Sequence, residues 1–435
     1  MDLLRVNDPG GAYPPSYYHA TANAFEPCPP LDGDVSVHVC IIGAGFTGLS
    51  AALYLSGKGM DVLVLDANRV GWGASGRNGG QLGSGQRLGQ QELEKTIGAD
   101  HGRQLWDLAE EAKKTVRGYI AEHRIECGLR SGLIHGALNS RAAEAAKTEV
   151  AHLQEHLDYD KLSILDTGAI RRALGTRMYV GGVLDEGAGH LHPLNFALGM
   201  ATAARERGVR IHEMTRVVSV GETSPHVVKT ESGSITAERV IYACNGYHGG
   251  IEPRAAARIM PINNFIVTTE PLGRERAKSL IRDNVAVNDS KFVVNYFRLT
   301  EDDRMLFGGG ETYGYKFPGD IAAKVRPNML KVYPQLKDAK IEHAWGGTLG
   351  ITRSRLPYFR AHDSTRLFAG GFSGHGVAMA TQAGKLMAQY VVGTPEGFDA
   401  FAKLTHDRFP GGAKARHPLL VLAMSWYALR DRLGV

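Results

Sequence analysis

The hydrophobic pattern of the chain begins with short apolar runs and continues with longer amphipathic stretches. Apolar runs at 37–42 and 61–65 predict two buried strands, and apolar residues at helical spacing predict a helix over 46–58 between them. The stretch 91–122 predicts one or two amphipathic helices, and one face carries Leu105, Leu108, Ala112, Val116 and Ile120. A further helix is expected over 142–156.

The second half of the chain changes to short strands. The segment 209–243 predicts a meander, with Ser232-Gly233 as a tight turn between two of its strands. Residues 251–340 combine strands, among them "NNFIVTTE", "FVVNYFRLT" and "RMLFGGG", with one helix over 321–333. The stretch "LFAGGFSGHGVAMATQAGKLMAQYVV" predicts a strand, a glycine loop and a helix, and the final "SWYALRDRL" is expected to pack against the protein. These elements predict an α/β protein.

The composition limits the classes of protein to which this chain can belong. The chain has 435 residues, 43% hydrophobic and 22% charged, which is ordinary for a globular protein of two domains or one large α/β unit. The start has no signal-peptide pattern, and no apolar run reaches the roughly 18 residues of a membrane span. A net charge of +5 with both signs interspersed argues against nucleic-acid binding. The four cysteines have neither CxxC nor metal-ligand spacing, which predicts reduced thiols in the cytoplasm and no metal site: Cys28, Cys40, Cys127 and Cys244.

The first strand runs into a glycine motif, Gly43-Ala-Gly45-Phe-Thr-Gly48, that fits G-x-G-x-x-G. Its first glycine makes the tight turn, its second lets the backbone approach a pyrophosphate, and its third lets the helix pack on the strand. The N-terminus of the helix offers free N–H groups to that pyrophosphate. Asp66 ends the second strand, where its carboxylate can bind an adenosine ribose. The register of strand, helix, strand and acid predicts a dinucleotide site.

Three further features favour FAD over NAD. The loop "GWGASGRNGGQ" follows Asp66 directly, where a nicotinamide domain would continue into a crossover helix. The meander at 209–243 brings Ala243 and Gly246 back toward the first glycine loop. The segment "AGGFSGHGVAMATQAG" leaves backbone N–H groups free before a helix, and such a nest suits the N1–C2=O edge of a reduced flavin. The alternative interpretation of this segment is a glycine-rich turn between a strand and a helix.

In these motifs the chain resembles the D-amino-acid-oxidase-type flavoproteins, and within them the branch of bacterial gamma-glutamylputrescine oxidases. The resemblance extends over nearly the whole chain. "ASGRNGGQ" combined with "SGHG" is the fairly specific part, whereas the glycine motif is general. The remaining stretches are "SYYHATAN", "GHLHPLNFA", "YFRLTEDDRMLFGGG", "RLPYF" and "LRDRLGV".

The resemblance implies a discontinuous Rossmann-like FAD-binding domain and a second α+β substrate domain with an antiparallel sheet. We expect the FAD-binding domain at 1–90, 165–250 and 341–435, and the substrate domain at 91–164 and 251–340. The implied reaction oxidises the amine end of a gamma-glutamylated diamine by hydride transfer to flavin N5. The imine hydrolyses to an aldehyde and ammonia, and O2 reoxidises the flavin to give hydrogen peroxide. The family carries this out in the cytoplasm during putrescine breakdown.

Two departures from relatives sharpen this expectation. Sarcosine-oxidase relatives attach their flavin through a cysteine in the C-terminal half, but this chain has no cysteine after Cys244, so non-covalent FAD is predicted. Those relatives also carry a lysine after the SGHG-type loop that binds the substrate carboxylate. Here Val377-Ala378 stands at that position, which disfavours small amino acids and is consistent with a primary amine far from a carboxylate.

The predicted FAD contacts lie in the glycine motif, at the second strand, in the following loop, in the meander and in the last glycine loop. They are Gly43, Gly45, Phe46, Thr47, Gly48, Asp66, Ala67, Gly73, Ala74, Ser75, Arg77, Asn78, Gly79, Gly80, Gln81, Val217, Ala243, Gly246, Gly371, Ser373, Gly374, His375, Gly376 and Val377. For Arg77, Asn78 and Gln81 the alternative to reaching the isoalloxazine is hydrogen bonding within the loop.

Candidate catalytic residues are few, because hydride transfer from an amine needs positioning more than acid–base chemistry. Tyr296 and Arg298 alternate on one strand and share a face. Tyr296 is a candidate wall of the amine pocket. Arg298 is either a partner for a glutamyl carboxylate or an ordinary surface arginine.

One tryptophan and three histidines are also interpreted from their place in the sequence. Trp345 either shapes the pocket or belongs to the core. His375 is placed by the glycine loop near the flavin carbonyl edge. His190 and His192 have no identifiable third metal ligand, so packing or capping before a helix at Leu194 is predicted.

The expected partners are a small-molecule amine and O2, and the sequence leaves the oligomeric state open. An alternative enzyme keeps the fold but oxidises a secondary amine or an amino acid, with O2 or another acceptor. A flavin-binding module without turnover and an NAD-dependent dehydrogenase are the remaining hypotheses. If the purified protein contains FAD and an amine reduces it, both the flavin-binding module and the NAD-dependent dehydrogenase are excluded.

Overall fold

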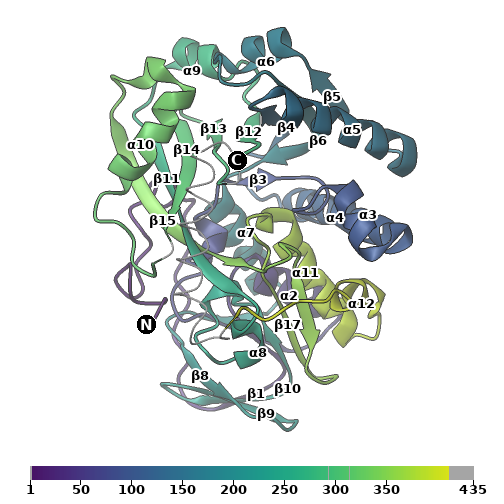
Figure 1. The fold of residues 1–435 in the computed structure, drawn as a ribbon. Helices are drawn as coiled ribbons and strands as arrows, with labels where there is room; N and C mark the ends of the chain where they lie inside the picture. Colours follow the sequence, from purple (N-terminus) through teal and green to yellow (C-terminus); the bar gives the residue numbers. More distant parts are fainter. Residues whose placement is uncertain (1, 292, 313, 411–435) are drawn as a thin grey trace.

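The protein is built around two β-sheets with helices packed against them (Figure 1). The structure is a computed structural model, and it describes residues 2–291, 293–312 and 314–410. The dinucleotide sheet, which contains the first strand, lies in the lower half of Figure 1, and the second sheet lies in the upper half.

The dinucleotide sheet has a parallel centre. Its strands run in the order β17 (Arg366–Gly370), β10 (Ser234–Tyr242), β1 (Val35–Ile42), β2 (Val62–Leu65) and β7 (Arg210–His212). All four residues of β2 are buried, as expected for a parallel strand covered on both faces. The strands predicted at 37–42 and 61–65 are therefore confirmed.

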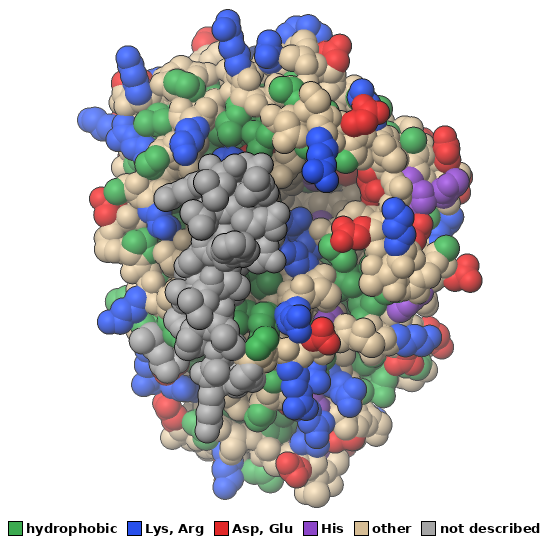
Figure 2. Space-filling model, in the orientation of Figure 1, with side chains coloured by type: hydrophobic (Ala, Val, Ile, Leu, Met, Phe, Trp, Pro, Cys, Tyr) green, Lys and Arg blue, Asp and Glu red, His purple; other side chains and the backbone are tan. Residues whose placement is uncertain are grey.

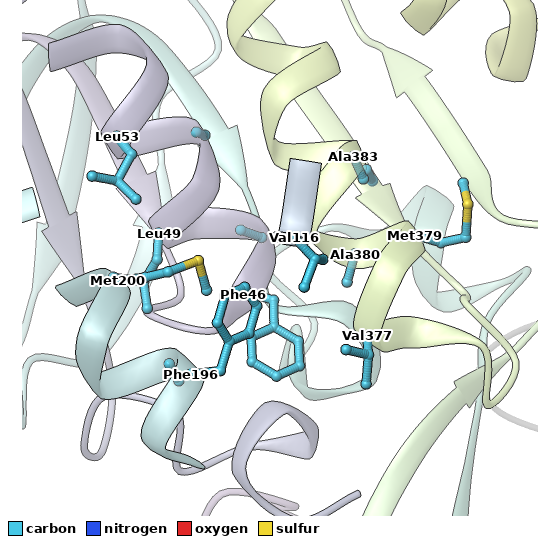
Figure 3. Packing of buried hydrophobic residues seen from close by; sticks show 14 of the residues in the cluster. Phe46, Leu49, Leu53, Val116, Phe196, Met200, Val377, Met379, Ala380 and Ala383 are labelled. Atoms are coloured by element: carbon cyan, nitrogen blue, oxygen red, sulfur yellow. The ribbon is translucent and has the colours of Figure 1, made fainter. Parts of the chain in front are cut away.

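Helices cover one face of this sheet and form the largest core (Figure 3). The helices are α2 (Phe46–Ser56), α4 (Ala99–Glu122), α7 (Pro193–Glu206) and α11 (Gly376–Val391). The rings of Phe46 on α2 and Phe196 on α7 pack with their centroids 5.3 Å apart and their planes tilted by 49°. Helices α2 and α11 approach closely because Gly384 has no side chain, and a Cβ there would lie 2.0 Å from the Thr47 carbonyl oxygen.

The predicted meander adds antiparallel strands to this sheet. Strands β8 (Val217–Val220) and β9 (His226–Thr230) pair with each other, and β9 pairs with β10. The Thr230 N–H donates to the Gly233 carbonyl at 2.9 Å, so the tight turn predicted at Ser232-Gly233 is confirmed. At the other edge, β16 (Tyr358–Ala361) runs antiparallel to β17.

The second sheet is mostly antiparallel, and β5 (Leu162–Leu165) pairs with its strand β6. In order across the sheet its strands are β15 (Ile341–Ile351), β11 (Met260–Thr269), β14 (Met305–Thr312), β13 (Tyr296–Leu299), β12 (Ala286–Asp289), β4 (Arg130–Ala137), β6 (Gly181–His190) and β3 (Gln81–Leu82). The remaining helices are α1 (Tyr17–Ala20), α3 (Gln90–Ile97), α5 (Ser140–Leu157), α6 (Thr167–Leu174), α8 (Pro253–Ala256), α9 (Arg274–Leu280), α10 (Ile321–Val332) and α12 (Glu396–Ala402).

The structure differs from the sequence-based expectations in three places. The glycine-rich segment 71–86 contains the short strand β3 and a 3₁₀ turn, Ala74–Gly76. The strand expected over 292–300 starts only at Tyr296. Strands β3, β6 and β15, which the predicted division assigned to the FAD-binding domain, lie in the second sheet. The division into domains otherwise remains a prediction, and the terminal segment "SWYALRDRL" lies outside the described residues.

No helix among the described residues is long and apolar enough to cross a membrane. The face shown in Figure 2 carries charged side chains of both signs, as the interspersed charges of the sequence predict.

Candidate active site

The site lies where the parallel strands of the dinucleotide sheet end. Gly43 follows β1, Asp66 follows β2, Ala243 follows β10 and Gly371 follows β17, so segments far apart in the sequence meet at one sheet edge. Backbone hydrogen bonds join them: the Gly43 N–H donates to Leu65 at 2.7 Å, and the Ala243 N–H donates to Ile42 at 2.8 Å. This edge is the usual ligand site of an open α/β sheet.

Each glycine of the first motif is required by a close contact. Gly43 has φ +115°, and a Cβ on it would lie 2.8 Å from the Ala243 carbonyl oxygen. A Cβ on Gly45 would lie 2.7 Å from Ser75 Oγ, which accepts a hydrogen bond from the Phe46 N–H at the start of α2. A Cβ on Gly48 would lie 1.9 Å from the Gly43 carbonyl oxygen. The motif therefore has the geometry of a dinucleotide turn.

Asp66 points its carboxylate at the same turn. It accepts hydrogen bonds at 2.8 Å from the N–H groups of Ala44 and Asn68. Burial raises the pKa of Asp66 to about 6, so the carboxylate is charged at neutral pH. A charged acceptor at the end of the second strand suits the hydroxyls of a ribose.

A cavity of about 640 Å³ runs from this turn to the second sheet. Twenty of the predicted FAD contacts line it: Gly43, Gly45, Phe46, Thr47, Asp66, Ala67, Gly73, Ala74, Ser75, Arg77, Asn78, Gly79, Gln81, Val217, Ala243, Ser373, Gly374, His375, Gly376 and Val377. The cavity thus joins all three glycine-rich segments, although their contacts with FAD stay predictions.

Four predicted contacts lie behind the cavity wall instead: Gly48, Gly80, Gly246 and Gly371. Gly48, Gly80 and Gly371 have no room for a Cβ. A Cβ on Gly80 would lie 2.0 Å from the Leu191 carbonyl oxygen, and one on Gly371 would lie 2.5 Å from Thr352 Cγ2. A Cβ on Gly246 would lie 3.4 Å from the Gly350 Cα, which is an ordinary van der Waals contact. These four glycines support the site without lining it.

The three polar residues after the phosphate loop bond mainly to protein. Arg77 donates to the Trp72 carbonyl at 2.6 Å and pairs with Asp8 at 2.6 Å. Asn78 bonds to backbone groups of its own loop, at 2.8–3.0 Å. Gln81 donates to the Val287 carbonyl at 2.8 Å. All three residues line the cavity. The alternative of hydrogen bonding within the loop describes Asn78, whereas Arg77 and Gln81 also bond to segments outside the loop, and their contacts with FAD stay predictions.

Tyr296 forms part of the cavity wall, as the sequence predicts. Its ring covers Gly79, where a Cβ would come within 2.7 Å of it, and its hydroxyl donates to Asn264 Oδ1 at 2.5 Å. Burial raises the pKa of Tyr296 far above its usual range, so the phenol stays protonated. Tyr296 and Asn264 thus offer a neutral wall to a substrate.

Arg298 and Trp345 do not line the cavity. Trp345 takes its core alternative, whereas Arg298 lies neither at the cavity wall nor at the surface. Arg298 is 5% exposed and donates to the carbonyls of Gly79 and Leu191, at 3.0 and 3.2 Å. These carbonyls occupy the guanidinium, which therefore fastens the glycine-rich loop to β13. Trp345 belongs to the core and donates to the Arg77 carbonyl at 3.0 Å.

His375 reaches the cavity from the loop before α11. Its ring covers Gly83, where a Cβ would lie 2.7 Å from it, and it bonds to the Gly85 carbonyl. Burial, followed by the nearby Arg87 charge, lowers the pKa of His375 to about 4, so the imidazole is neutral at neutral pH.

The other histidine pair is structural, as predicted. His192 caps α7 by accepting a hydrogen bond from the Asn195 N–H at 3.1 Å. His190 bonds to the Asn284 carbonyl at 2.8 Å. Among the described residues, no group of His, Cys, Asp and Glu side chains is placed to hold a metal ion.

Sequence reasoning missed several residues of the cavity wall. Arg87, Glu311 and Arg355 come from three distant segments and bring charge to it, and Asn264 adds an amide. Arg87 lies just past the "NGGQ" loop, and Glu311 ends the "FGGGE" run, so adjacency to glycine-rich segments was the available signal. Arg355 opens the stretch "RLPYF", which is part of the family resemblance, but nothing in that stretch places its turn at the cavity, because tertiary structure alone does so.

The arrangement fits FAD. The glycine cradle at the start of α2 suits a pyrophosphate, and Asp66 suits a ribose. Two buried nitrogens at the cavity wall, Arg77 Nη2 and His375 Nε2, have no hydrogen-bond partner among the described residues, as expected where a polar ligand belongs.

Comparisons with known proteins also indicate an FAD-binding protein. A family model described as "DAO: FAD dependent oxidoreductase" matches residues 38–390. The chain is 42% identical to "Gamma-glutamylputrescine oxidoreductase" of Escherichia coli (strain K12), over 97% of this chain and 99% of that protein. It is 40% identical to "Probable oxidoreductase OrdL" of Rhizobium meliloti (strain 1021), over 96% of this chain and 97% of that protein.

Solved structures share the fold at low sequence identity. Glycine oxidase from Geobacillus kaustophilus superposes with a TM-score of 0.70 at 20% identity, covering 82% of this chain and 95% of that one. L-alpha-glycerophosphate oxidase from Mycoplasma pneumoniae, with FAD bound, gives 0.68 at 17% identity, covering 86% and 97%. The protein therefore belongs to the DAO family and is an FAD-dependent oxidoreductase.

Proposed function

We propose that this enzyme oxidises the terminal primary amine of gamma-glutamylputrescine, or of a related glutamyl polyamine, to an aldehyde. Ammonia and hydrogen peroxide are the other products, and O2 is the acceptor. The observation that carries the proposal is the 42% identity to the E. coli protein, which extends over 97% of the chain. The four free cysteines are consistent with work in the cytoplasm.

The cavity wall supports this chemistry. Bound FAD would accept the hydride and pass its electrons to O2. The chain has to position the amine and keep water away, and the neutral groups of Tyr296, Asn264 and His375 suit that task. Val377 lines the cavity in the first turn of α11 and offers no charge to a carboxylate.

Non-covalent binding of FAD is part of the proposal. Cys244 is the cavity-lining cysteine, and burial raises the pKa of its thiol to about 12. A protonated thiol is a poor nucleophile, so it does not suit covalent attachment. Acid precipitation should therefore release all the flavin into the supernatant.

A second candidate is the oxidation of a secondary amine or an amino acid, with O2 or another acceptor. Arg87 and Arg355 favour it, because guanidinium groups in the cavity can bind an amino-acid carboxylate.

The deciding experiment is the visible spectrum of the purified protein without oxygen, before and after addition of gamma-glutamylputrescine. We expect the flavin band to bleach, and air to restore it with formation of peroxide. A flavin that this substrate leaves oxidised, but that sarcosine or proline bleaches, would establish the second candidate instead. Bleaching that air does not reverse would show an acceptor other than O2.

A further inference from the structure

A second pocket lies beside β16, the edge strand of the dinucleotide sheet. It has a volume of about 500 Å³ and shares no described lining residue with the cavity of the candidate active site. Its described wall comes from α8 and the turn after it, from β16, and from the end of α12 with the segment that follows. Figure 2 shows Lys and Arg side chains gathered in this part of the molecule, in the lower half of the view.

The charged side chains that line this pocket are all cations, and no carboxylate lines it among the described residues. We call it the basic pocket, and its cations are Arg254, Arg258, Arg360, Lys403 and Arg408. None of the five forms an ion pair within the described part of the chain. His406 also lines the pocket but adds no charge at neutral pH, because burial lowers its pKa to about 4.

Two carboxylates that are close to the basic pocket in sequence have arginine partners outside it. Asp407 pairs with Arg353 at 3.3 Å, and Asp363 pairs with Arg366 at 2.9 Å. Neither of these arginines lines the pocket. The arginines beside the pocket therefore have carboxylate partners, whereas those that line it have none.

A third carboxylate, Glu252, is buried at the start of α8. It accepts hydrogen bonds from the N–H groups of Arg254 and Ala255, at 2.9 and 3.4 Å, and it pairs with His362 at 2.9 Å. Its side chain is 8% exposed and does not line the pocket. Even with the charge of Glu252 counted in full, the five cations exceed it by four.

Two guanidinium groups of the basic pocket are held in place by uncharged protein groups. Arg258 donates to the carbonyls of His406 and Arg254, each at 3.1 Å, and lies 5.7 Å from the centre of the Tyr358 ring. The Arg254 guanidinium bonds to His362 Nδ1 at 3.2 Å. These contacts orient the two groups but leave their charges uncompensated.

The positive charges converge on the buried Tyr358. Burial raises the pKa of its hydroxyl, and the charges of three arginines act against that shift: Arg258, Arg360 and Arg254. Several guanidinium groups around one point suit a compact anion better than an extended polymer. The volume of the pocket lies in the range of small-molecule sites, and guanidinium groups bind phosphate oxygens with directed, paired hydrogen bonds.

We propose that the basic pocket binds a small molecule that carries a chain of linked phosphoryl groups. Such a chain brings several negative charges close together, whereas a single carboxylate would leave most of the excess charge uncompensated. Inorganic polyphosphate and nucleoside triphosphates share this chemistry. The site is separate from the oxidation of an amine, so it does not depend on the proposed function.

Titration calorimetry of the oxidised holoenzyme in metal-free buffer tests this, with tripolyphosphate as the probe. The holoenzyme is used so that FAD occupies the dinucleotide site. We expect one tripolyphosphate per chain, bound about tenfold more tightly than citrate, whose charges are carboxylates, and binding should weaken as salt is added. ATP distinguishes the two sources: tighter binding than tripolyphosphate indicates a nucleotide, and weaker binding indicates inorganic polyphosphate.

Substitutions place the probe in the basic pocket. Arg258→Gln and Arg360→Gln should each weaken tripolyphosphate binding about tenfold or more, because each removes a charged hydrogen-bonding group. Arg360 makes no side-chain hydrogen bond within the described residues, so this variant remains informative if Arg258→Gln does not fold. The control is Arg282→Gln, which removes the same charge from an exposed arginine near the second sheet and should change the affinity less than twofold. The flavin spectrum of each variant checks that it is folded.

Three results would overturn the proposal. The first is an absence of tripolyphosphate binding, or equal binding by the wild type and both pocket variants. The second is citrate binding as tight as that of tripolyphosphate, which would show that the pocket does not select phosphoryl groups. The third is an equal loss in Arg282→Gln and Arg360→Gln, which would show that binding follows net charge rather than the pocket.

Discussion

The backbone around Gly48 leaves no room for a single methyl group. This residue occupies the first turn of α2, and its Cα lies so close to the loop after β1 that a Cβ would come within 1.9 Å of the Gly43 carbonyl oxygen. Because that oxygen belongs to the backbone, it cannot swing aside as a flexible side chain would. The whole start of α2 would have to move, and with it the N–H groups that suit a pyrophosphate.

We therefore expect Gly48→Ala to lower the free energy of unfolding by about 2 kcal/mol or more, as in overpacked cores, and to reduce the FAD content. Denaturant titration and the ratio of flavin to protein absorbance measure both effects. The control is Gly118→Ala on α4, where a Cβ meets nothing within 4 Å. That change should leave stability equal or raise it by up to about 1 kcal/mol. A Gly48→Ala protein with normal stability and flavin content would contradict this account.

Arg298 shows what residue-level sequence reasoning could and could not do. Alternation on a strand places Tyr296 and Arg298 on one face, and both contact Gly79. Neither of the two interpretations of Arg298 describes its place in the structure, because the side chain is buried and backbone carbonyl groups of Gly79 and Leu191 occupy its guanidinium. No strand pattern shows which carbonyls a fold leaves unpaired.

At the scale of elements, the start of the chain is joined to the glycine-rich loop after β2. Trp72 donates to the Ala12 carbonyl at 2.8 Å, and the Arg77 guanidinium lies 4.3 Å from the Trp72 ring. The Arg77–Asp8 ion pair completes the junction, with its side chains 2% and 9% exposed. Its position indicates that Arg77 organises the loop rather than reacting with substrate.

Asp8→Ala should therefore lower the free energy of unfolding by about 3 kcal/mol, since it leaves a buried guanidinium without its partner. Chemical denaturation tests this, and the flavin spectrum of the folded variant should stay unchanged. Asp61→Ala serves as the matched control, because its pair with Arg210 is 40–45% exposed and such pairs contribute at most about 1 kcal/mol. Equal losses in the two variants would mean that the Arg77 pair has no special structural role.

At the scale of the whole molecule, the cavity lies between the two sheets. Its wall takes Asp66 and Ala243 from the ends of the dinucleotide sheet, and Tyr296 and Glu311 from the second sheet. FAD bound there would contact segments of both, and a ligand that binds only the folded protein stabilises it.

Removal of FAD should thus lower the midpoint of thermal unfolding, and added FAD should restore it in a concentration-dependent way. At a free concentration of about 100 times Kd, the gain is about 2.7 kcal/mol. Circular dichroism of the apoprotein measures the midpoint. Riboflavin is the control ligand, because it lacks the pyrophosphate that α2 would bind and should shift the midpoint less. Equal midpoints with and without FAD would mean that the folded protein does not bind FAD in preference to the unfolded chain.

The dinucleotide turn could be predicted from the sequence, because its parts follow one another along the chain. A strand, a tight turn, a helix start and a terminal acid lie within residues 37–66, and each needs a particular residue type. The strands that join the second sheet and the charged residues that reach the cavity could be identified only from the folded structure. Arg87, Glu311 and Arg355 are up to 268 positions apart, counted from 87 to 355, and no local pattern links them. Long-range strand pairing and loop packing bring them together, and these follow from the fold as a whole.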